Sequence, residues 1–197
     1  MRIIGGCGKG RKLYTPSGGK MIRPTTDRAR EALFSIIDGY LDRANVMDVF
    51  CGTGSFGVEA ASRGASSVSF IDNSKLSLKI TRMNLAVIID SLHHAGLPPP
   101  AVSLSRLDLS RAVLANAELA VPLSQMDIIF LDPPYSTGLA QKTMQQIDLI
   151  DNFSKDIMVI AEESCKETPA ENLVRLGLSD VRRYGDSSFW FYRYKNE

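Results

Sequence analysis

Short apolar runs alternate with longer segments of helical periodicity along most of this 197-residue chain. Each run has about the length of a buried strand, and most runs are bounded by Gly, Asp or Pro. The segments between them carry apolar residues every three or four positions, which is typical of helices that pack on one face. The predicted strands are residues 45–50, 67–72, 101–108, 126–132 and 157–163. The predicted helices lie within residues 23–38, 55–63 and 74–89.

The residues at the ends of these segments support the same division. Thr26 or Asp27 can cap the first helix, and Gly64 can end the second. The stretch HHAGLPPPA (93–101) is predicted to be a surface loop, because three consecutive prolines cannot continue a helix. A Gly-Asp turn signal within residues 182–194 precedes an aromatic run and predicts a final antiparallel hairpin.

Strands that alternate with helices of this length indicate βαβ units, in which helices cover both faces of a parallel sheet. We therefore predict the α/β class, with a doubly wound, mostly parallel sheet that ends in an antiparallel C-terminal hairpin. A hydrophobic content of 44% suits one globular domain. The predicted division is a basic N-terminal extension, residues 1–24, which we expect to form a β-hairpin, and an α/β domain, residues 25–197.

The composition argues against a membrane or secreted protein. No run of 18 apolar residues is present, and the first residues, MRIIGGCGKGRK, lack the apolar stretch of a signal peptide. The three cysteines, Cys7, Cys51 and Cys165, are scattered and lack the spacing of metal ligands. We expect a cytoplasmic protein with reduced thiols, no metal and no membrane partner.

The net charge of +1 conceals a strong asymmetry. Residues 1–30 contain eight Lys or Arg and one Asp, so this part carries +7 and the rest of the chain carries −6. A basic segment on an acidic body is typical of a protein that binds a polyanion, although a solvated tail has the same composition. Candidate phosphate contacts for RNA binding are Lys9, Arg11, Lys12, Arg23, Arg28 and Arg30.

The first predicted strand runs into a glycine-rich loop, DVFCGTGSFG (48–57). Gly52, Gly54 and Gly57 form a G-x-G-x-x-G pattern between a strand and a helix, and Asp72 ends the next strand 20 residues after Gly52. This is the spacing of a dinucleotide-binding fingerprint, so an NAD-dependent oxidoreductase is one candidate. An ordinary tight turn is the plainer interpretation of the glycines alone.

Asp48 disfavours a dinucleotide, because a carboxylate just before the loop would repel a pyrophosphate. It suits a ligand with an amino-acid head, such as S-adenosylmethionine, whose ammonium can lie near Asp48. The carboxylate of that ligand can lie at the helix start, and its ribose hydroxyls can bond to Asp72. Asp108, at the end of the third strand, can bind the adenine amine, or it can cap the run that follows.

The fourth strand leads into DIIFLDPPYSTG (127–138), where an apolar run ends in Asp132, Pro133, Pro134 and Tyr135. If the first and fourth strands are neighbours, these residues face the glycine loop. Asp132 and the Pro133 carbonyl can accept hydrogen bonds from an exocyclic amine, and neither proline offers a competing N–H. Tyr135 can stack on an extruded base. The plainer interpretation is a proline-rich turn with Asp132 as a helix cap.

These motifs resemble the class I methyltransferases that modify exocyclic amines of nucleobases. The whole chain is similar to the bacterial 16S rRNA guanine-N2 methyltransferases of the RsmD type, which methylate guanine 966. The segments that carry the resemblance are, in order, MRIIGG, KGRKL, RPTTDRAREALF, DVFCGTGSFGVEAASRGA, IFLDPPY and YGDSSFWFYR.

The resemblance implies a Rossmann-like, seven-stranded fold, S-adenosylmethionine as the donor, and a guanine of 16S rRNA in the assembling small ribosomal subunit as the acceptor. By motif it assigns Gly52, Gly54 and Asp72 to the cofactor and Asp132–Tyr135 to the base. Thr25 and Asp27 can help to close over the cofactor or can simply cap the first helix. The rivals are an adenine-N6 DNA methyltransferase, the NAD-dependent oxidoreductase and a non-catalytic RNA-binding module.

Overall fold

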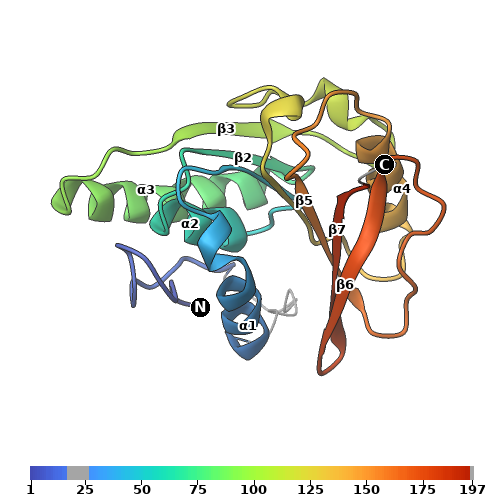
Figure 1. The fold of residues 1–197 in the computed structure, drawn as a ribbon. Coiled ribbons are helices and arrows are strands. Elements are labelled where there is room, and N and C mark those ends of the chain that lie inside the picture. The colour runs from blue at the N-terminus through green and yellow to red at the C-terminus, as the bar shows by residue number, and fades with distance from the viewer. Residues whose placement is uncertain (17–26, 196–197) are drawn as a thin grey trace.

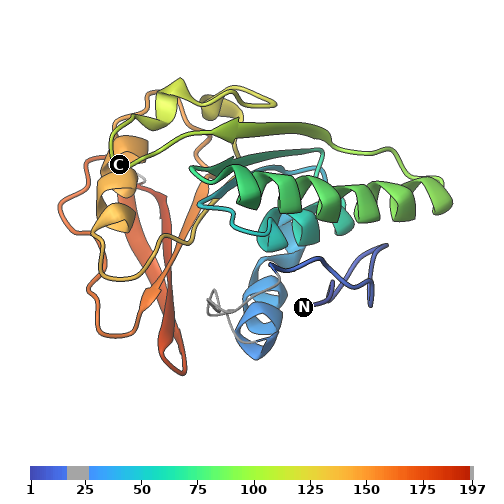
Figure 2. The same cartoon turned by 180° about the vertical axis from the view of Figure 1, so that it is seen from behind.

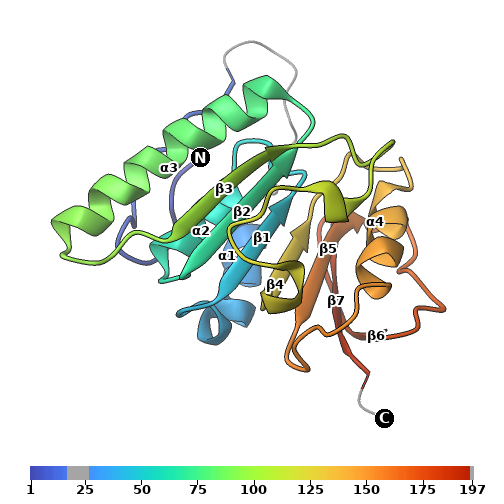
Figure 3. The same cartoon turned by 90° about the horizontal axis from the view of Figure 1, so that it is seen from above.

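A computed structural model describes residues 1–16 and 27–195 of the chain, and a seven-stranded sheet runs through its middle (Figure 1). The strands lie in the order β3-β2-β1-β4-β5-β7-β6, as Figure 3 shows from above. The strands are β1 (Asn45–Val49), β2 (Ser67–Asp72), β3 (Ala101–Arg106), β4 (Ile128–Leu131), β5 (Met158–Ser164), β6 (Leu176–Tyr184) and β7 (Ser187–Tyr194). The helices are α1 (Asp27–Ile37), α2 (Ser55–Ser62), α3 (Lys75–His94) and α4 (Leu139–Asp148), and the short 3-10 turns are η1 (Asp38–Tyr40), η2 (Leu114–Asn116) and η3 (Leu123–Gln125).

The topology is the predicted doubly wound one. β1 pairs in parallel with β2 on one side and with β4 on the other, so the strand order reverses between β1 and β4. β7 is antiparallel to both β5 and β6, and a two-residue turn, Gly185-Asp186, joins β6 to β7. The α/β class and the C-terminal hairpin are therefore confirmed.

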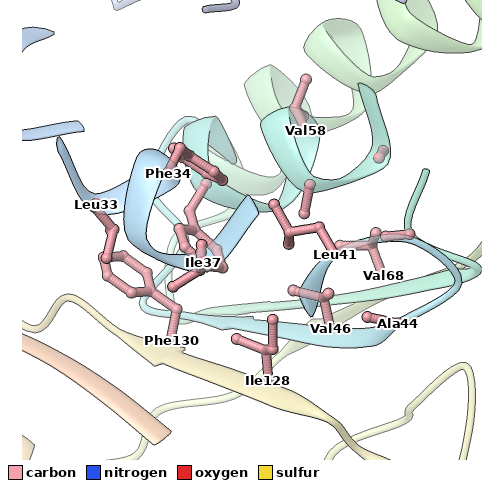
Figure 4. Packing of buried hydrophobic residues seen from close by; sticks show 14 of the residues in the cluster. Leu33, Phe34, Ile37, Leu41, Ala44, Val46, Val58, Val68, Ile128 and Phe130 are labelled. Carbon is pink, nitrogen blue, oxygen red and sulfur yellow. The ribbon is translucent and has the colours of Figure 1, made fainter. Parts of the chain in front are cut away.

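Each face of the sheet carries its own hydrophobic cluster, because side chains alternate along the buried strands. On the face covered by α1, α2 and α3, the rings of Phe34, Phe56 and Phe130 stack in series with centroid separations of 5.2 and 4.1 Å. Figure 4 shows Phe34 and Phe130 among the side chains of this cluster. On the other face, Met144 and Ile147 of α4 pack on Met47 of β1 and its neighbours.

Gly57 permits the close packing of α2 on β2. A Cβ atom at this position would lie 2.4 Å from Cε1 of Phe70 and 2.8 Å from Cγ1 of Val68, closer than such contacts occur. Gly64 has a different role: its φ of 101° reverses the chain after α2, and the N–H of Ala65 donates to the carbonyl of Ala60. The predicted helix end at Gly64 is therefore confirmed.

Substitution of Gly57 by alanine is expected to lower the free energy of unfolding by about 1–3 kcal/mol, because the methyl group must displace the ring of Phe70. Urea denaturation measures this loss. The matched control is Gly39→Ala, since Gly39 has an unstrained φ and no atom within 4 Å of the added Cβ. If both variants unfold at the wild-type urea concentration, the packing described for Gly57 is wrong.

Residues 1–14 lie against α2 and α3 (Figure 2), fastened mainly through their backbone. Arg2 and Lys12 form an antiparallel bridge, as expected of a hairpin, while residues 17–24 of the predicted extension lie outside the described residues. Both oxygens of the buried Glu59 carboxylate accept backbone N–H bonds, from Ile4 at 2.8 Å and from Gly5 at 2.7 Å. Residues 1–14 therefore pack against the α/β domain. The division of the chain into an extension, residues 1–24, and a domain, residues 25–197, stays a prediction.

The elements differ from the prediction at several points. α3 continues to His94, so the first two residues of the predicted 93–101 loop are helical; the chain turns at Gly96, whose φ is 68°. β3 ends at Arg106, two residues early. α4 was not predicted, although Ala140, Met144 and Ile147 are buried at helical spacing. β6 begins at Leu176, six residues before the predicted hairpin segment. Within residues 1–16 and 27–195, no helix has the length and hydropathy needed to span a membrane.

Candidate active site

The glycine loop (residues 50–54) and the D-P-P-Y residues leave adjacent strands at the same edge of the sheet. Val49 pairs with Leu131, and the N–H of Asp132 donates to the carbonyl of Val49 at 3.2 Å. The prediction that the first and fourth strands are neighbours is confirmed. The two loops, about 80 residues apart in sequence, meet where the strand order reverses, which is where doubly wound sheets bind ligands.

The glycine loop turns sharply through residues with left-handed backbone angles. Phe50, Gly52 and Gly54 have φ values of 61°, 55° and 74°. The N–H of Gly54 donates to the carbonyl of Cys51 at 2.7 Å, which closes the turn. Gly54 is the N-cap of α2 and has no side chain to cap it, and of the first three N–H groups the one of Gly57 is bound by Asp48. The first two N–H groups of α2 are therefore suited to an anionic ligand group.

Asp72 ties the end of β2 to the glycine loop. One carboxylate oxygen accepts from the N–H of Gly52 at 2.9 Å, and the other accepts from the N–H of Ser74 at 2.8 Å. Asp72 is partly exposed beside the loop. The carboxylate therefore fixes the position of Gly52 and remains at the surface where a ribose hydroxyl could bond to it.

Two polar residues of α3 hold the glycine loop through hydrogen bonds to its backbone, and neither was predicted as a site residue. Thr81 donates to the carbonyl of Gly52 at 3.1 Å, and Asn84 donates to the carbonyl of Thr53 at 2.8 Å. Both side chains are fully buried, with no exposed surface. Their signal was a pair of polar residues at i and i+3 on the apolar face of a helix, where such groups need partners.

Asp48 lies beneath the loop, 2% exposed, and accepts from the N–H of Gly57 at 2.9 Å. Burial raises the pKa of Asp48 to about 8. The charge of Asp72 adds to this increase, and the hydrogen bond from Gly57 opposes it. Burial likewise raises the pKa of the Cys51 thiol well above its usual range, so this thiol stays protonated. Cys51 is therefore unsuited to act as a nucleophile.

The Asp132 carboxyl group lies among other acids at the end of β4. Burial is the main cause that raises its pKa well above the usual range, and the charges of Glu162, Asp48 and Glu163 add to the effect. Beside Asp132, Pro133 is buried and Pro134 is exposed.

Tyr135 is held by its hydroxyl group. The Tyr135 hydroxyl lies 2.9 Å from Oγ of Ser187 and donates to Oε1 of Glu162 at 3.3 Å. Burial raises the pKa of Tyr135 to about 12, so the hydroxyl keeps its proton. Ser187 and Glu162 come from β7 and β5, and the sequence offered no signal for them, because their contact to Tyr135 depends on strand pairing.

The other predicted site residues are spread more widely. Asp108 accepts from the N–H and hydroxyl groups of Ser110 and is exposed, so it caps a turn, and its contact to an adenine stays a prediction. Thr25 and Arg23 lie outside the described residues, and Asp27 is described only as the start of α1.

The predicted phosphate-binding residues divide into three groups. Lys9, Lys12 and Arg28 are exposed. Arg11 is about half exposed and forms an ion pair with Asp90 at 2.8 Å. Arg30 is 5% exposed and donates to the carbonyl of Arg2, so its prediction as a phosphate contact is wrong. The charge count could not reveal this, because it records the type of a residue but not its burial.

Comparisons with known proteins agree with this geometry. Ribosomal RNA small subunit methyltransferase D of Haemophilus influenzae is 34% identical over 173 residues, which cover 86% of this chain and 81% of that protein. A solved structure titled "Putative methyltransferase yhhF from Escherichia coli" superposes with a TM-score of 0.75 over 100% of this chain and 99% of that one, at 24% identity. An RNA methyltransferase from Salinibacter ruber, solved with S-adenosyl-L-homocysteine, has a TM-score of 0.59 over 88% of this chain and 95% of that one, at 15% identity.

Residues 1–193 match the family described as "Conserved hypothetical protein 95". The match therefore includes the N-terminal segment, the glycine loop, the D-P-P-Y residues and the C-terminal hairpin. The chain belongs to this family, and the predicted likeness to methyltransferases of the RsmD type is confirmed.

Proposed function

We propose that this protein transfers a methyl group from S-adenosylmethionine to the exocyclic N2 amine of guanine 966 in 16S rRNA. The observation that carries the proposal is the pairing of β1 with β4, which brings the glycine loop and the D-P-P-Y residues together at one edge. The name of the Haemophilus influenzae relative supports a ribosomal RNA substrate. The assembling small subunit as the setting, and guanine 966 as the target, rest on the resemblance of the motifs.

The residues at the glycine loop fit S-adenosylmethionine. The N–H groups of Ser55 and Phe56 at the start of α2 suit its carboxylate, and Asp72 lies at the end of the next strand, where ribose hydroxyls bind in folds of this kind. Gly52 has no side chain and little around it, so a ligand can approach the backbone closely. When bound, the cofactor supplies an electrophilic methyl group on a sulfonium. Asp48 lies buried beneath the loop, and the ammonium group of the cofactor beside it would favour the ionised form of this carboxyl group.

The D-P-P-Y residues are suited to activate an amine. The nitrogen lone pair of a nucleobase amine is delocalised into the ring, so the amine is a poor nucleophile. Acceptors on both hydrogens, from Asp132 and the Pro133 carbonyl, would localise that lone pair and direct it at the methyl group. Asp132 can then take the proton that the nitrogen loses on methylation. Because Ser187 and Glu162 fix the Tyr135 hydroxyl, the orientation of the ring is set before a base arrives.

The two rival enzymes explain less. Adenine-N6 methylation of DNA would use the same acceptors, but the 34% identical relative is named as a ribosomal RNA enzyme. An oxidoreductase would need the pyrophosphate of NAD beside Asp48, whose buried carboxyl group would oppose it. A non-catalytic RNA-binding module would not need the acids that gather beside both loops.

Two measurements test the proposed function together. Calorimetry is expected to show binding of S-adenosylhomocysteine, and mass mapping of small-subunit RNA is expected to show one N2-methylguanine that requires this protein. A modified adenine in DNA instead would favour the rival substrate. Tight NADH binding without S-adenosylhomocysteine binding would refute the proposal.

Two substitutions at Tyr135 are expected to distinguish the contribution of the ring, which would stack on the base, from that of the hydroxyl group, which holds the ring in place. Tyr135→Ala removes the stacking platform, an interaction of about 1–3 kcal/mol per base, and so lowers kcat/KM for RNA about 5- to 150-fold. Tyr135→Phe keeps the ring and loses only the bonds to Ser187 and Glu162, so its loss is expected to be smaller. Methyl transfer at varied RNA concentrations measures both, and affinity for S-adenosylhomocysteine is expected to stay at the wild-type value. Equal losses in the two variants would mean that the ring does not stack.

The exposed lysines of the N-terminal segment are expected to contact phosphate. Replacing Lys9 and Lys12 together by Ala removes two charges that have no ion pair within the described residues. RNA binding is expected to weaken, and the slope of log K against log salt is expected to fall by about 0.7 for each lost contact. Binding titrations at four salt concentrations measure the slope. Lys155→Ala, an exposed lysine just before β5, is the control, and a slope unchanged in both variants would exclude these contacts.

A further inference from the structure

We propose that Asn84 couples RNA binding on residues 1–14 to the conformation of the glycine loop, so that RNA and cofactor each increase the affinity for the other. Asn84 would then be a positioning residue that touches neither ligand. The inference rests on the proposed function, because it takes the N-terminal segment as an RNA surface and the glycine loop as the cofactor site. It concerns the link between these two parts of the molecule.

The carboxamide of Asn84 makes three hydrogen bonds, two to Tyr14 of the N-terminal segment and one to Thr53 of the glycine loop. Its Oδ1 accepts from the N–H of Tyr14 at 2.6 Å. Its Nδ2 donates to the carbonyl of Tyr14 at 3.1 Å and to the carbonyl of Thr53 at 2.8 Å. The N-terminal segment and the glycine loop therefore share one amide group, and Asn84 has no exposed surface through which water could replace either partner.

This arrangement leaves the carboxamide little freedom. Because Oδ1 must face the N–H of Tyr14, the amide cannot flip, and both hydrogens of Nδ2 are used by carbonyl groups. A rotation that follows a displaced Tyr14 would lengthen the bond to Thr53. An unsatisfied buried carbonyl group is unfavourable, so the state in which both segments are in place is favoured. The side chain of Tyr14 is 51% exposed, and it therefore lies where a bound RNA could contact it.

Two neighbouring residues fasten one partner each and so provide matched controls. Within residues 1–16 and 27–195, the Ser62 hydroxyl bonds to the N-terminal segment alone: it accepts from the N–H of Gly8 at 2.9 Å and donates to the carbonyl of Gly5 at 2.7 Å. Thr81 holds only the glycine loop, through its bond to the carbonyl of Gly52 at 3.1 Å and its contact with Cys51. Asn84 is the residue of α3 that bonds to both.

The test measures a coupling factor, which is the ratio of the Kd of S-adenosylhomocysteine without RNA to its Kd with saturating RNA. The RNA is a small-subunit rRNA fragment that the wild-type protein methylates. For the wild-type protein we expect a factor of about 5 or more, and the same factor for RNA affinity with and without S-adenosylhomocysteine, because binding linkage is reciprocal. Asn84→Ala is expected to reduce the factor to about 1. Ser62→Ala is expected to weaken RNA binding, and Thr81→Val to weaken S-adenosylhomocysteine binding, while both keep the wild-type factor.

Asn84→Asp is the second variant, to be used if Asn84→Ala does not fold. It keeps the side-chain volume but loses both donated hydrogen bonds, and thermal unfolding verifies that it is folded. A factor of 1 in the wild-type protein, an unchanged factor in the Asn84 variants, or an equal loss in Ser62→Ala would each overturn the inference. Absence of S-adenosylhomocysteine binding would refute the proposed function as well, whereas binding without coupling refutes the inference alone.

Discussion

Replacing Asp132 by alanine is expected to lower kcat for methyl transfer about 100- to 10,000-fold, because the variant loses the acceptor that aligns the amine and takes its proton. Affinity for S-adenosylhomocysteine is expected to change little, since the glycine loop is held by Asp72, Thr81 and Asn84 rather than by Asp132. Single-turnover methylation and calorimetry measure the two quantities separately. A parallel loss of turnover and cofactor affinity would instead assign Asp132 to the architecture of the site.

The matched control for this experiment is Asp156→Asn, an exposed acid in the loop before β5, which is expected to behave as the wild-type protein. Asp132→Asn then distinguishes two roles of the carboxylate. Asparagine keeps an acceptor oxygen but cannot take a proton. Near wild-type turnover in Asp132→Asn would mean that alignment alone accounts for the effect.

The pH dependence provides independent evidence on Asp132. Burial, with the charges of Glu162, Asp48 and Glu163, raises the pKa of Asp132 well above its usual range. Asp132 can take a proton only when it is ionised, so kcat is expected to fall as the pH decreases through this raised pKa. The cationic cofactor opposes the shift, so the midpoint for kcat is expected below the midpoint for the free protein. The limb due to Asp132 is expected to disappear in Asp132→Asn.

Asp48→Asn is expected to stabilise the protein and to weaken cofactor binding. Burial raises the pKa of Asp48 from 3.8 to about 8, so the folded protein retains a proton that the unfolded chain releases. The stability of the wild-type protein is therefore expected to fall as the pH rises from about 4 to about 8. At pH 7 this corresponds to at most about 4 kcal/mol, at about 1.4 kcal/mol per pKa unit. Asparagine removes this contribution and can still accept the bond from Gly57.

Urea denaturation at pH 4 and pH 7 measures the free energy of unfolding of Asp48→Asn relative to the wild-type protein. An increase is expected at pH 7 and not at pH 4. An equal difference at both pH values would mean that Asp48 is ionised in the folded protein. The same variant is expected to bind S-adenosylhomocysteine at least about tenfold less tightly, because the ligand's ammonium lowers the pKa of Asp48 and pairs with the ionised carboxylate, which asparagine cannot provide. Wild-type affinity in Asp48→Asn would remove Asp48 from the cofactor site and leave it a support for the N–H of Gly57.

The sequence was most informative where backbone geometry decides the structure. Gly64 and the Gly185-Asp186 turn end elements where they were predicted to, because a left-handed φ or a two-residue turn restricts the residue type locally. The meeting of the two loops was also predictable, because β1 and β4 are buried on both faces and doubly wound sheets place such strands in the middle.

The sequence was least informative where a polar group finds its partner through tertiary packing. Asn84 and Tyr14 are 70 residues apart, and no local pattern pairs them. Ser187 reaches Tyr135 only because β7 inserts beside β5. Asp108 was placed on a strand that ends two residues earlier, at Arg106, because apolar alternation does not mark where pairing stops. In each case the sequence shows the type of the residue but not which residues lie beside it in the folded protein.

The backbone contacts of residues 1–14 have a consequence for synthesis on the ribosome. Gly5 and Gly8 find their partners, Glu59 and Ser62, 54 residues further along the chain, and Tyr14 must wait for Asn84, 70 residues later. Residues 1–14 are made before all of these partners and can therefore be among the last residues to be fastened. Any fusion placed ahead of them would have to leave this segment free to fold back onto α2 and α3 after α3 has emerged.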